Sequence, residues 1–544
     1  MAQVWRSPVF ELLVGDGFVY DRWAERIASG DWLGRSVFYQ SPLYPYFMAV
    51  LYAIFGHAPG VVRVAQAILS SAACAALARA GGLFAPRFGG KWAGVLLALY
   101  GPALFFDAII QKASLDLFLT CATLWTVAEA WVEGKPRWSF AAGVACGLLA
   151  LNRENALLLV PLIPAGFAIF DRERAIPRMR MASWCLLGSA CVLLPVGARN
   201  AVVGGEFHLT TSQFGPNFYI GNRPGADGLY HPLRTGRGSA LLEQTDATEL
   251  AEQALGRKLG PREVSDFWTE QTIRGIEKQP GAWAKLMLRK AVLVWNAREI
   301  PDSEDPILYR ERSWILRSLS TVWNFAVLAP LAAAGLFATW NWRRLWPVYV
   351  MLAGLWFSLA LFFLFARYRF PLVPPLLVGA AVLPAALREF NGNWKRLAGP
   401  IAAFALMAAV AAAPLAKVEH PAVLAHFNLG VTLAGRGRNA EAEAEYRKAL
   451  AEMPAWFPAR VNLAKVLADQ GRGDEALAEY EKVLKAQPKN AYAHVNVGNL
   501  LLARGKAAEA REHFAAALRA EPGMPEAQAG LRAADQAMPH EKSR

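Results

Sequence analysis

The feature of this sequence that most constrains its fold is a series of long apolar runs. A helix needs about 20 mostly apolar residues to cross the hydrocarbon core of a membrane. Runs near this length recur ten times, two of them short, at roughly 61–83, 91–110, 113–132, 138–152, 155–170, 182–198, 314–340, 345–366, 370–387 and 397–415. The mean hydropathy of +0.22 and the 55% share of hydrophobic residues agree with this pattern. We therefore predict an all-α fold whose main part is a polytopic helical membrane bundle.

The placement of positive charge gives the topology. The net charge of +13 does not indicate a nucleic-acid partner, because much of it lies in short connections between the apolar runs. Basic residues occupy every second connection: Arg87 and Lys91; Lys135 and Arg137; Arg172, Arg174, Arg178 and Arg180; Arg343 and Arg344; Arg388, Lys395 and Arg396. The positive-inside rule makes these connections cytoplasmic. The long connection 199–312 and everything after about 416 are then expected on the other side of the membrane.

The sequence offers no pattern for a resident metal or nucleotide. The five cysteines, Cys74, Cys121, Cys146, Cys185 and Cys191, all lie inside apolar runs, where packing is their expected role. His231 has no second histidine or acid at ligand spacing. A phosphate-cradling glycine loop of the nucleotide type is absent from the sequence. We therefore predict no metal ligands and no certain cofactor, and leave a requirement for a divalent cation open.

The sequence after about residue 421 repeats with a period of 34. The columns in phase are Asn428, Asn462 and Asn496; Gly437, Gly471 and Gly505; Ala442, Ala476 and Ala510; Tyr446, Tyr480 and Phe514; and Pro454, Pro488 and Pro522. Two helices per unit, a glycine turn between them and a proline that ends the second helix are typical of tetratricopeptide repeats. Residues 421–538 are therefore predicted to form a soluble α-solenoid of three units and a final helix.

These patterns divide the chain into five segments. The predicted order is 1–60, a first outer loop with juxtamembrane helices; 61–198, an N-terminal transmembrane bundle; 199–312, a large periplasmic loop that acts as a lid or small subdomain; 313–416, C-terminal transmembrane helices; and 421–538, the tetratricopeptide repeats.

Five stretches carry a resemblance to a known family. The first 60 residues hold Asp16, Tyr20, Ala24, Gly30 and Pro42-Leu43-Tyr44, and the later stretches are GVVRVAQAILS, GLLALNRENALLLVP, RNAVVGGEFHLTTSQFGPNFYIGNRPGADGLY and FARYRFPLVPPLL. In this order they resemble GT-C-type membrane glycosyltransferases, which include protein O-mannosyltransferases and aminoarabinose transferases. The resemblance spans about 1–415.

The sequence departs from the family pattern in two places. The adjacent Asp-Glu pair of the family reads Asp16-Gly17 here, which leaves the role of a second carboxylate without a residue. The family also has a helix before the Asp16 loop, whereas this chain starts inside the loop. Because the alternating charges place residue 16 outside, we expect the true start codon to lie upstream; the alternative is an N-terminus that is translocated without an anchor.

The resemblance implies transfer of a hexose or pentose from a polyprenyl phosphate to an acceptor, with inversion at the anomeric carbon. Such a reaction needs a carboxylate that takes the acceptor's proton and cationic or amide groups that hold the leaving phosphate. Asp16 is the candidate base, and its alternative role is that of a helix N-cap. Asp107, at the outer end of its apolar run, is the second candidate catalytic residue, and its alternative is a solvated acid at a helix end.

The candidate substrate-binding residues are Tyr20, Lys112, Arg153, Asn217, Asn222, Arg367 and Arg369. Lys112 and Asp116 are four residues apart on one predicted helix, so the simpler expectation for Asp116 is a pair with Lys112. The arginines suit phosphate oxygens, and their alternative is to extend to the membrane interface. The asparagines suit sugar hydroxyls, and their alternative is an ordered turn.

In the repeats, Asn428, Asn462 and Asn496 resemble the asparagine ladder of the O-linked N-acetylglucosamine transferase, which binds a peptide backbone. The alternative is a consensus residue without this role. Either way, the concave face of such a stack binds peptide or protein.

The first expectation is therefore a glycosyltransferase of a bacterial cytoplasmic membrane, with its repeats on the periplasmic side. Its expected partners are a lipid-linked sugar donor, membrane lipids and a protein acceptor or partner, with no nucleic acid. One alternative is a membrane-anchored repeat scaffold, although a tether needs one span rather than ten. The other is an enzyme like an O-antigen polymerase or ligase, which would use arginines of its large outer loop, here Arg223, Arg234 and Arg237.

Overall fold

The computed structural model contains helices and no β-strand among the residues that it describes. It describes the chain except residues 1, 2, 4–7, 87–88, 171–174, 235–239, 301–303, 341, 390–393, 416–420 and 539–544. The chain divides into two compact units, 1–417 and 418–544, which are considered separately below. The all-helical prediction is confirmed.

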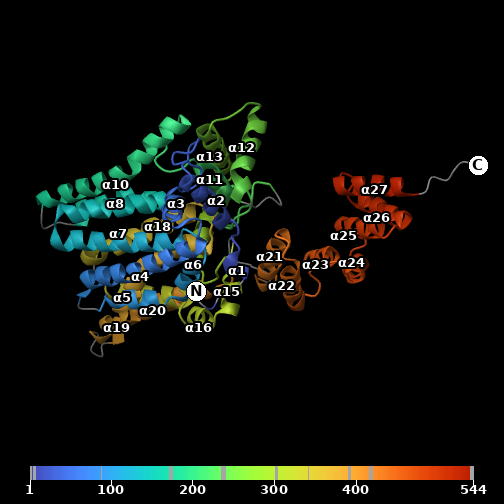
Figure 1. Ribbon diagram of the computed structural model, residues 1–544. Helices are drawn as coiled ribbons and strands as arrows, with labels where there is room; N and C mark the ends of the chain where they lie inside the picture. Colours follow the sequence, from blue (N-terminus) through green and yellow to red (C-terminus); the bar gives the residue numbers. More distant parts are fainter. Residues whose placement is uncertain are drawn as a thin grey trace, which may run out of the picture. The chain divides into compact units, whose positions relative to one another are not determined.

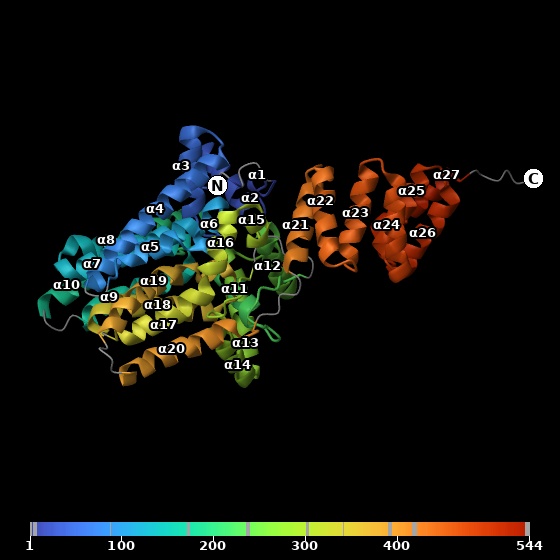
Figure 2. The ribbon, with the colours of Figure 1, turned by 90° about the horizontal axis from the view of Figure 1, so that it is seen from below.

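Seven helical segments in the described part of the first unit are long and apolar enough to cross a membrane. They are α4 (Pro59–Phe84), α7 (Ala113–Glu133), the part Met179–Gly204 of α10 (Ala175–Gly204), α16 with α17 (Trp314–Val322 and Phe325–Ala338), α18 (Trp342–Leu361), η3 with α19 (Ala366–Leu372 and Val373–Arg388) and α20 (Trp394–Ala412). Figures 1 and 2 show most of them running side by side in one bundle. The number and length of these helices indicate a multi-pass membrane protein.

Three of the ten predicted runs form shorter helices. The run 91–110 divides into α5 (Trp92–Ala98) and α6 (Gly101–Ala108), because Pro102 lacks the N–H that a continuous helix needs. Gly101 also lets the chain approach α16 closely, since a Cβ there would lie 2.5 Å from the Ser320 nitrogen. The other two runs form α8 (Pro136–Asn152) and the pair η2 and α9 (Glu154–Leu158 and Leu159–Phe170). Of the ten predicted runs, two of which were expected to be short, seven therefore form helices long and apolar enough to cross a membrane among the described residues.

Short helices gather at one end of the bundle (Figure 1). From the first segment come α1 (Pro8–Glu11), α2 (Asp16–Ala28) and α3 (Leu43–Phe55); from the large loop come α11 (Phe214–Asn222), α12 (Ala240–Leu255), α13 (Pro261–Lys278), α14 (Pro280–Leu293) and α15 (Pro306–Arg312). Trp268 of α13 packs on Tyr219 of α11 with ring centroids 4.6 Å apart, and its indole donates to the Ala247 carbonyl of α12. The loop helices thus have a small core of their own.

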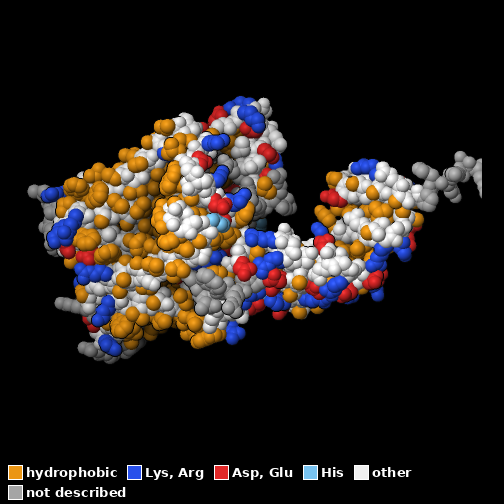
Figure 3. Space-filling model, in the orientation of Figure 1, with side chains coloured by type: hydrophobic (Ala, Val, Ile, Leu, Met, Phe, Trp, Pro, Cys, Tyr) orange, Lys and Arg blue, Asp and Glu red, His pale blue; other side chains and the backbone are white. Residues whose placement is uncertain are grey.

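The surface of the first unit separates apolar from charged side chains. Figure 3 shows a broad apolar surface over the long helices, with Lys and Arg gathered at the end where α7 turns into α8 and α10 begins. Lys135 lies in the first of these connections and Arg137 in the first turn of α8. The apolar surface suits contact with lipid, and the basic end is the one that the positive-inside rule assigns to the cytoplasm.

The second unit consists of seven helices in its described part. They are α21 (Pro421–Gly435), α22 (Asn439–Glu452), α23 (Phe457–Asp469), α24 (Gly473–Ala486), α25 (Ala491–Ala503), α26 (Ala507–Ala520) and α27 (Pro525–Ala537). The repeated glycines Gly437, Gly471 and Gly505 have φ of 72°, 80° and 76°, in the left-handed region that favours glycine between two helices. The repeated alanines and aromatics are buried. The predicted three helix pairs and final helix are confirmed.

A candidate active site at the helix-rich end of the bundle

A cavity of about 1140 Å³ lies in the first unit and combines charged with apolar walls. Its charged and amide lining includes Asp16, Gln40, Lys112, Arg153, Glu154, Gln213, Asn217, Glu243 and Arg367. Its apolar lining includes Leu157, Leu158, Val160, Pro161, Leu193, Phe207, Phe214, Leu361, Phe362, Phe363 and Phe365. The volume is above the usual range for small-molecule sites. The walls therefore suit a large ligand that has both a polar and an apolar part.

Asp16 is the first residue of α2 and forms a buried ion pair with Arg367 of η3. Gly15 before it has a φ of 54°, which sets the sharp entry of the chain into the helix, and Gly15 rather than Asp16 occupies the N-cap position. Burial raises the pKa of Asp16, but the charge and hydrogen bond of Arg367, helped by Lys112 and Gln111, bring the pKa below its ordinary value. Asp16 is therefore ionised, as a proton acceptor must be.

A second buried pair joins Arg153 to Asp116. Arg153 Nε donates to Asp116 Oδ2 over 2.7 Å, and the side chains are only 4% and 0% exposed. Asn152 Nδ2 donates to the other carboxylate oxygen over 2.8 Å. The expected pair of Asp116 with Lys112 is therefore wrong, because helix α8 ends beside Asp116 and brings to it a guanidinium that donates twice to one carboxylate oxygen.

Glu154 connects three segments around Lys112. Its carboxylate accepts from Ser41 at 2.6 Å and from Gln213 at 2.7 Å, and lies 3.9 Å from Lys112 Nζ. Lys112 Nζ also donates to Ser41 over 2.9 Å. Glu154 thus holds the first outer loop and the large loop against the end of α7.

Tyr368 lies between the two arginines of the cavity. Arg153 and Arg367 have their guanidinium carbons 5.3 and 5.0 Å from the centroid of its ring. The ring face attracts cations, so Tyr368 holds two positive groups near each other that would otherwise repel.

Comparisons with known proteins identify the parts of the chain. Residues 39–198 match the family model for dolichyl-phosphate-mannose-protein mannosyltransferase, and residues 423–448 and 461–525 match tetratricopeptide-repeat models. The chain joins a GT-C-type mannosyltransferase-family domain to tetratricopeptide repeats. The family indicates a membrane glycosyltransferase, and the repeats indicate protein interaction.

Two further comparisons add little. The crystal structure of the P58(IPK) TPR domain is similar to the chain at 13% identity with a TM-score of 0.21, over 74% of this chain and 99% of that chain. A TM-score this low does not establish a shared fold. No curated protein matches the chain.

The large cavity brings together six of the residues chosen from the sequence: Asp16, Tyr20, Lys112, Arg153, Asn217 and Arg367. Tyr20 is buried, and burial raises its pKa well above the ordinary value, so that it stays neutral. The buried Asn217 Oδ1 has no hydrogen-bond partner. This oxygen is placed to accept a hydrogen bond from a ligand hydroxyl.

Three of the chosen residues do not line this cavity. Asp107 lies inside the bundle and accepts from Ser70 at 2.6 Å and Ser114 at 2.8 Å. Arg369 binds the Asn296 carbonyl and lies 3.1 Å from Glu299.

Asn222, the third of these residues, has both sides of its amide engaged. Its Nδ2 donates to the Phe218 and Leu361 carbonyls, while its Oδ1 accepts from Trp283 and Lys290. The site assignment is therefore corrected for Asp107, Asn222 and Arg369, whose polar groups are already used within the fold.

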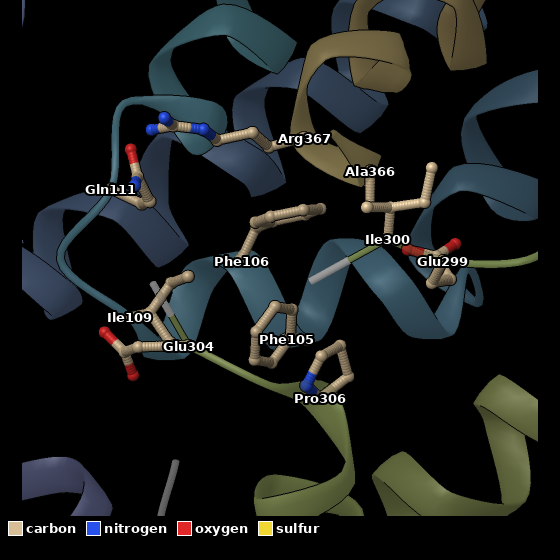
Figure 4. A pocket seen from close by; sticks show the side chains of 10 residues that line it. All are labelled: Phe105, Phe106, Ile109, Gln111, Glu299, Ile300, Glu304, Pro306, Ala366 and Arg367. Carbon is tan, nitrogen blue, oxygen red and sulfur yellow. The ribbon is translucent and has the colours of Figure 1, made fainter. Parts of the chain in front are cut away.

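A second, small cavity of about 30 Å³ meets the first only at Arg367. Figure 4 shows Phe105 and Phe106 at its centre, Glu304 at one side and Glu299 at the other. Its volume holds about one water molecule, so it is too small for a sugar. The larger cavity is the candidate substrate site.

The asparagines of the repeats differ in their surroundings. Asn462 lies at the Tyr446 hydroxyl and Asn496 at the Tyr480 hydroxyl, each on the helix before it, whereas Asn428 is exposed. Two of the three amides thus face a neighbouring helix, which favours the consensus role over a peptide ladder.

Several lining residues were not chosen from the sequence. The sequence contains a feature that could have predicted Glu154, since it interrupts two apolar runs together with Arg153. It also contains one for Tyr368, which stands between two arginines. Gln40 and Gln213 have none, because their role depends on which loops the bundle brings together.

Proposed function

We propose that the chain transfers a sugar from a polyprenyl-phosphate donor to an acceptor at the periplasmic face of a bacterial cytoplasmic membrane. The observation that carries this proposal is the large cavity, which joins an ionised carboxylate and three cations to walls of Leu, Val, Pro and Phe. A polyprenyl-phosphate sugar has the same division between a charged head and an apolar tail. The repeats are proposed to recruit a protein acceptor or partner.

In the proposed reaction, an acceptor oxygen attacks the anomeric carbon of the sugar and the bond from that carbon to the phosphate oxygen breaks. Asp16 takes the acceptor's proton, and polyprenyl phosphate leaves with the bonding electron pair. Lys112, Arg153 and Arg367 stabilise the negative charge that grows on the phosphate. Asn217 accepts a hydrogen bond from a sugar hydroxyl.

Arg367 has two roles in this proposal. In the structure it pairs with Asp16. A donor phosphate competes for the guanidinium, and turning Arg367 toward the phosphate raises the basicity of Asp16 because a positive neighbour is withdrawn. Donor binding thus prepares the base.

The two alternatives receive less support. A tethered scaffold has no use for a cavity with paired charges inside the bundle. The polymerase alternative would use arginines of the large loop. Arg223 donates to backbone carbonyls and Arg234 pairs with Asp246 and Glu249, and neither arginine lines the cavity. Arg237 lies outside the described residues.

The test compares lipid-linked sugars and glycoproteins in a deletion strain that carries wild-type or variant genes. Asp16→Asn is expected to lower transfer by about 10²-fold or more, since it removes the general base. Asp107→Asn is the matched control, a buried acid away from the cavity, and is expected to transfer normally. Membrane abundance of both variants is measured beside transfer. Wild-type transfer by a well-folded Asp16→Asn protein would remove Asp16 as the base.

A further inference from the structure

A histidine and two carboxylates meet on the side of α2 that faces α3. Asp21 and Glu25 are four residues apart on α2 and so share one face of the helix. His57 lies in the turn between α3 and α4. Its Nε2 is 2.9 Å from Asp21 Oδ1, and its Nδ1 is 4.0 Å from Glu25 Oε1. One ligand atom of each residue lies within 4.8 Å of the others.

The charge of Asp21 is poorly compensated within the protein. Its side chain is only 7% exposed, and its oxygen accepts from the Tyr52 hydroxyl at 2.6 Å and meets His57. Among the described residues, neither Lys nor Arg forms an ion pair with Asp21. A buried carboxylate needs a positive partner, and a second carboxylate nearby increases that need.

We infer that Asp21, Glu25 and His57 bind a divalent cation, and that Zn²⁺ is the ion that suits them. Imidazole nitrogen and carboxylate oxygen are both zinc ligands, and three protein ligands with a water in the fourth position form a known type of site. Zinc bonds of about 2.1 Å bring tetrahedral ligands to about 3.4 Å from one another. The three ligand atoms lie within 4.8 Å of one another, and Glu25, whose side chain is 40% exposed and 3.6 Å from the Arg22 guanidinium, would leave that exposed pair and rotate inward to complete the site.

The surroundings of these residues support a site rather than a chance meeting. The Tyr52 hydroxyl binds the Asp21 carboxylate, and its ring lies edge-on to the His57 ring with centroids 4.9 Å apart. Such outer contacts fix the orientation of metal ligands. No other three His, Cys, Asp or Glu side chains in the described part of the chain meet at this spacing.

The position of the ion gives it a structural consequence. Asp21 lies one residue after Tyr20 and five after Asp16 on the same helix. A bound ion would fasten α2 to the turn between α3 and α4 and so fix the helix that carries the candidate base. This inference concerns a site outside the proposed sugar-transfer cavity, and its test needs no sugar donor.

The test uses the full chain in detergent, purified without a polyhistidine tag and dialysed against a chelator. Zn²⁺ is titrated by calorimetry, and thermal unfolding is followed with and without the ion. We expect one saturable site and a higher melting temperature with Zn²⁺. His57→Ala is expected to weaken binding at least tenfold, and Tyr52→Phe to weaken it about tenfold through loss of the outer hydrogen bond.

His231→Ala is the matched control, because His231 also lies 3.1 Å from a carboxylate, Asp227, but meets no second acid or thiol at ligand spacing among the described residues. It should bind Zn²⁺ like the wild type. Asp21→Asn provides a second variant if His57→Ala folds poorly. No saturable binding, or equal affinity in wild type, His57→Ala and Asp21→Asn, would mean an adventitious ion only and would overturn the inference.

Discussion

Gly17 stands where the glycosyltransferases that the sequence resembles carry the second carboxylate of a pair, and the structure leaves no room there for a side chain. A Cβ on Gly17 would lie 2.9 Å from the Ile110 carbonyl oxygen. Ordinary contacts of a Cβ begin near 3.4 Å, so Gly17→Ala requires a shift of about half an ångström between α2 and the loop before α7. Asp16 is the adjacent residue and moves with α2.

This shift sets the expected magnitude. Overpacking of this kind costs about 1–3 kcal/mol of stability. A displacement of about 1 Å at a catalytic group costs roughly 10²-fold in rate, so half of it predicts a loss of about tenfold. Gly17→Glu, which would restore the family's pair of acids, is expected to lose more, because the longer side chain meets the same carbonyl.

The assay measures transfer of labelled sugar in membranes from the complemented deletion strain, normalised to the amount of protein. Gly281→Ala is the control, since a Cβ there meets nothing within 4 Å. The reasoning is refuted when Gly17→Ala transfers at the wild-type rate, or when Gly17→Glu is more active than wild type.

Two further predictions follow from side chains of the large loop. Asn217→Ala should raise the KM for donor at unchanged melting temperature, because its oxygen is buried without a partner, whereas Asn222→Ala should lower the melting temperature, because it removes four hydrogen bonds. Burial lowers the pKa of Lys290 to about 7, so the folded state holds fewer protons than the unfolded state between pH 7 and the ordinary lysine pKa. Stability should therefore rise with pH in this window, by up to about 1.4 kcal/mol per pH unit. In Lys290→Met the melting temperature should rise less with pH than in the wild type. An equal rise in both proteins would contradict the lowered pKa of Lys290.

Much of the candidate site was accessible from the sequence because charge is rare in an apolar chain. A charged residue at the end of an apolar run is costly to place and marks a pathway or site. This reasoning found Asp16, Lys112, Arg153 and Arg367, and the structure brings all four to one cavity. The repeats were accessible for another reason, since five columns in phase fix the turns and the buried faces.

The prediction for Asp107 was wrong because the sequence pattern does not give the rotation of a helix about its own axis. Asp107 also ends an apolar run, but α6 turns it toward Ser70 and Ser114 inside the bundle. Arg369 follows Arg367 by two residues, and the tight η3 helix directs it to Asn296 and Glu299. Periodicity gives the helix, whereas packing decides which face each side chain occupies.

The pairing of the cavity's cations bears on how such a site selects its ligand. Lys112 meets Glu154, Arg153 meets Asp116 and Arg367 meets Asp16, so each positive group has a carboxylate before any donor arrives. The three pairs differ in how readily the cation can leave its carboxylate for a ligand. Asp116 is fully buried and held from two sides, so Arg153 stays fixed and serves as a positioned positive charge.

Arg367 is the group placed to change partners. Its partner carboxylate, Asp16, is the proposed proton acceptor once Arg367 leaves it. If Arg153 left Asp116, the Asp116 carboxylate would stay buried without a positive partner. A ligand that lacks the phosphate leaves Arg367 on Asp16 and the base weak. In the proposed mechanism, the ion pair couples recognition of the leaving group to activation of the base, which gives a physical reason why an acid so well paired can act as the proton acceptor.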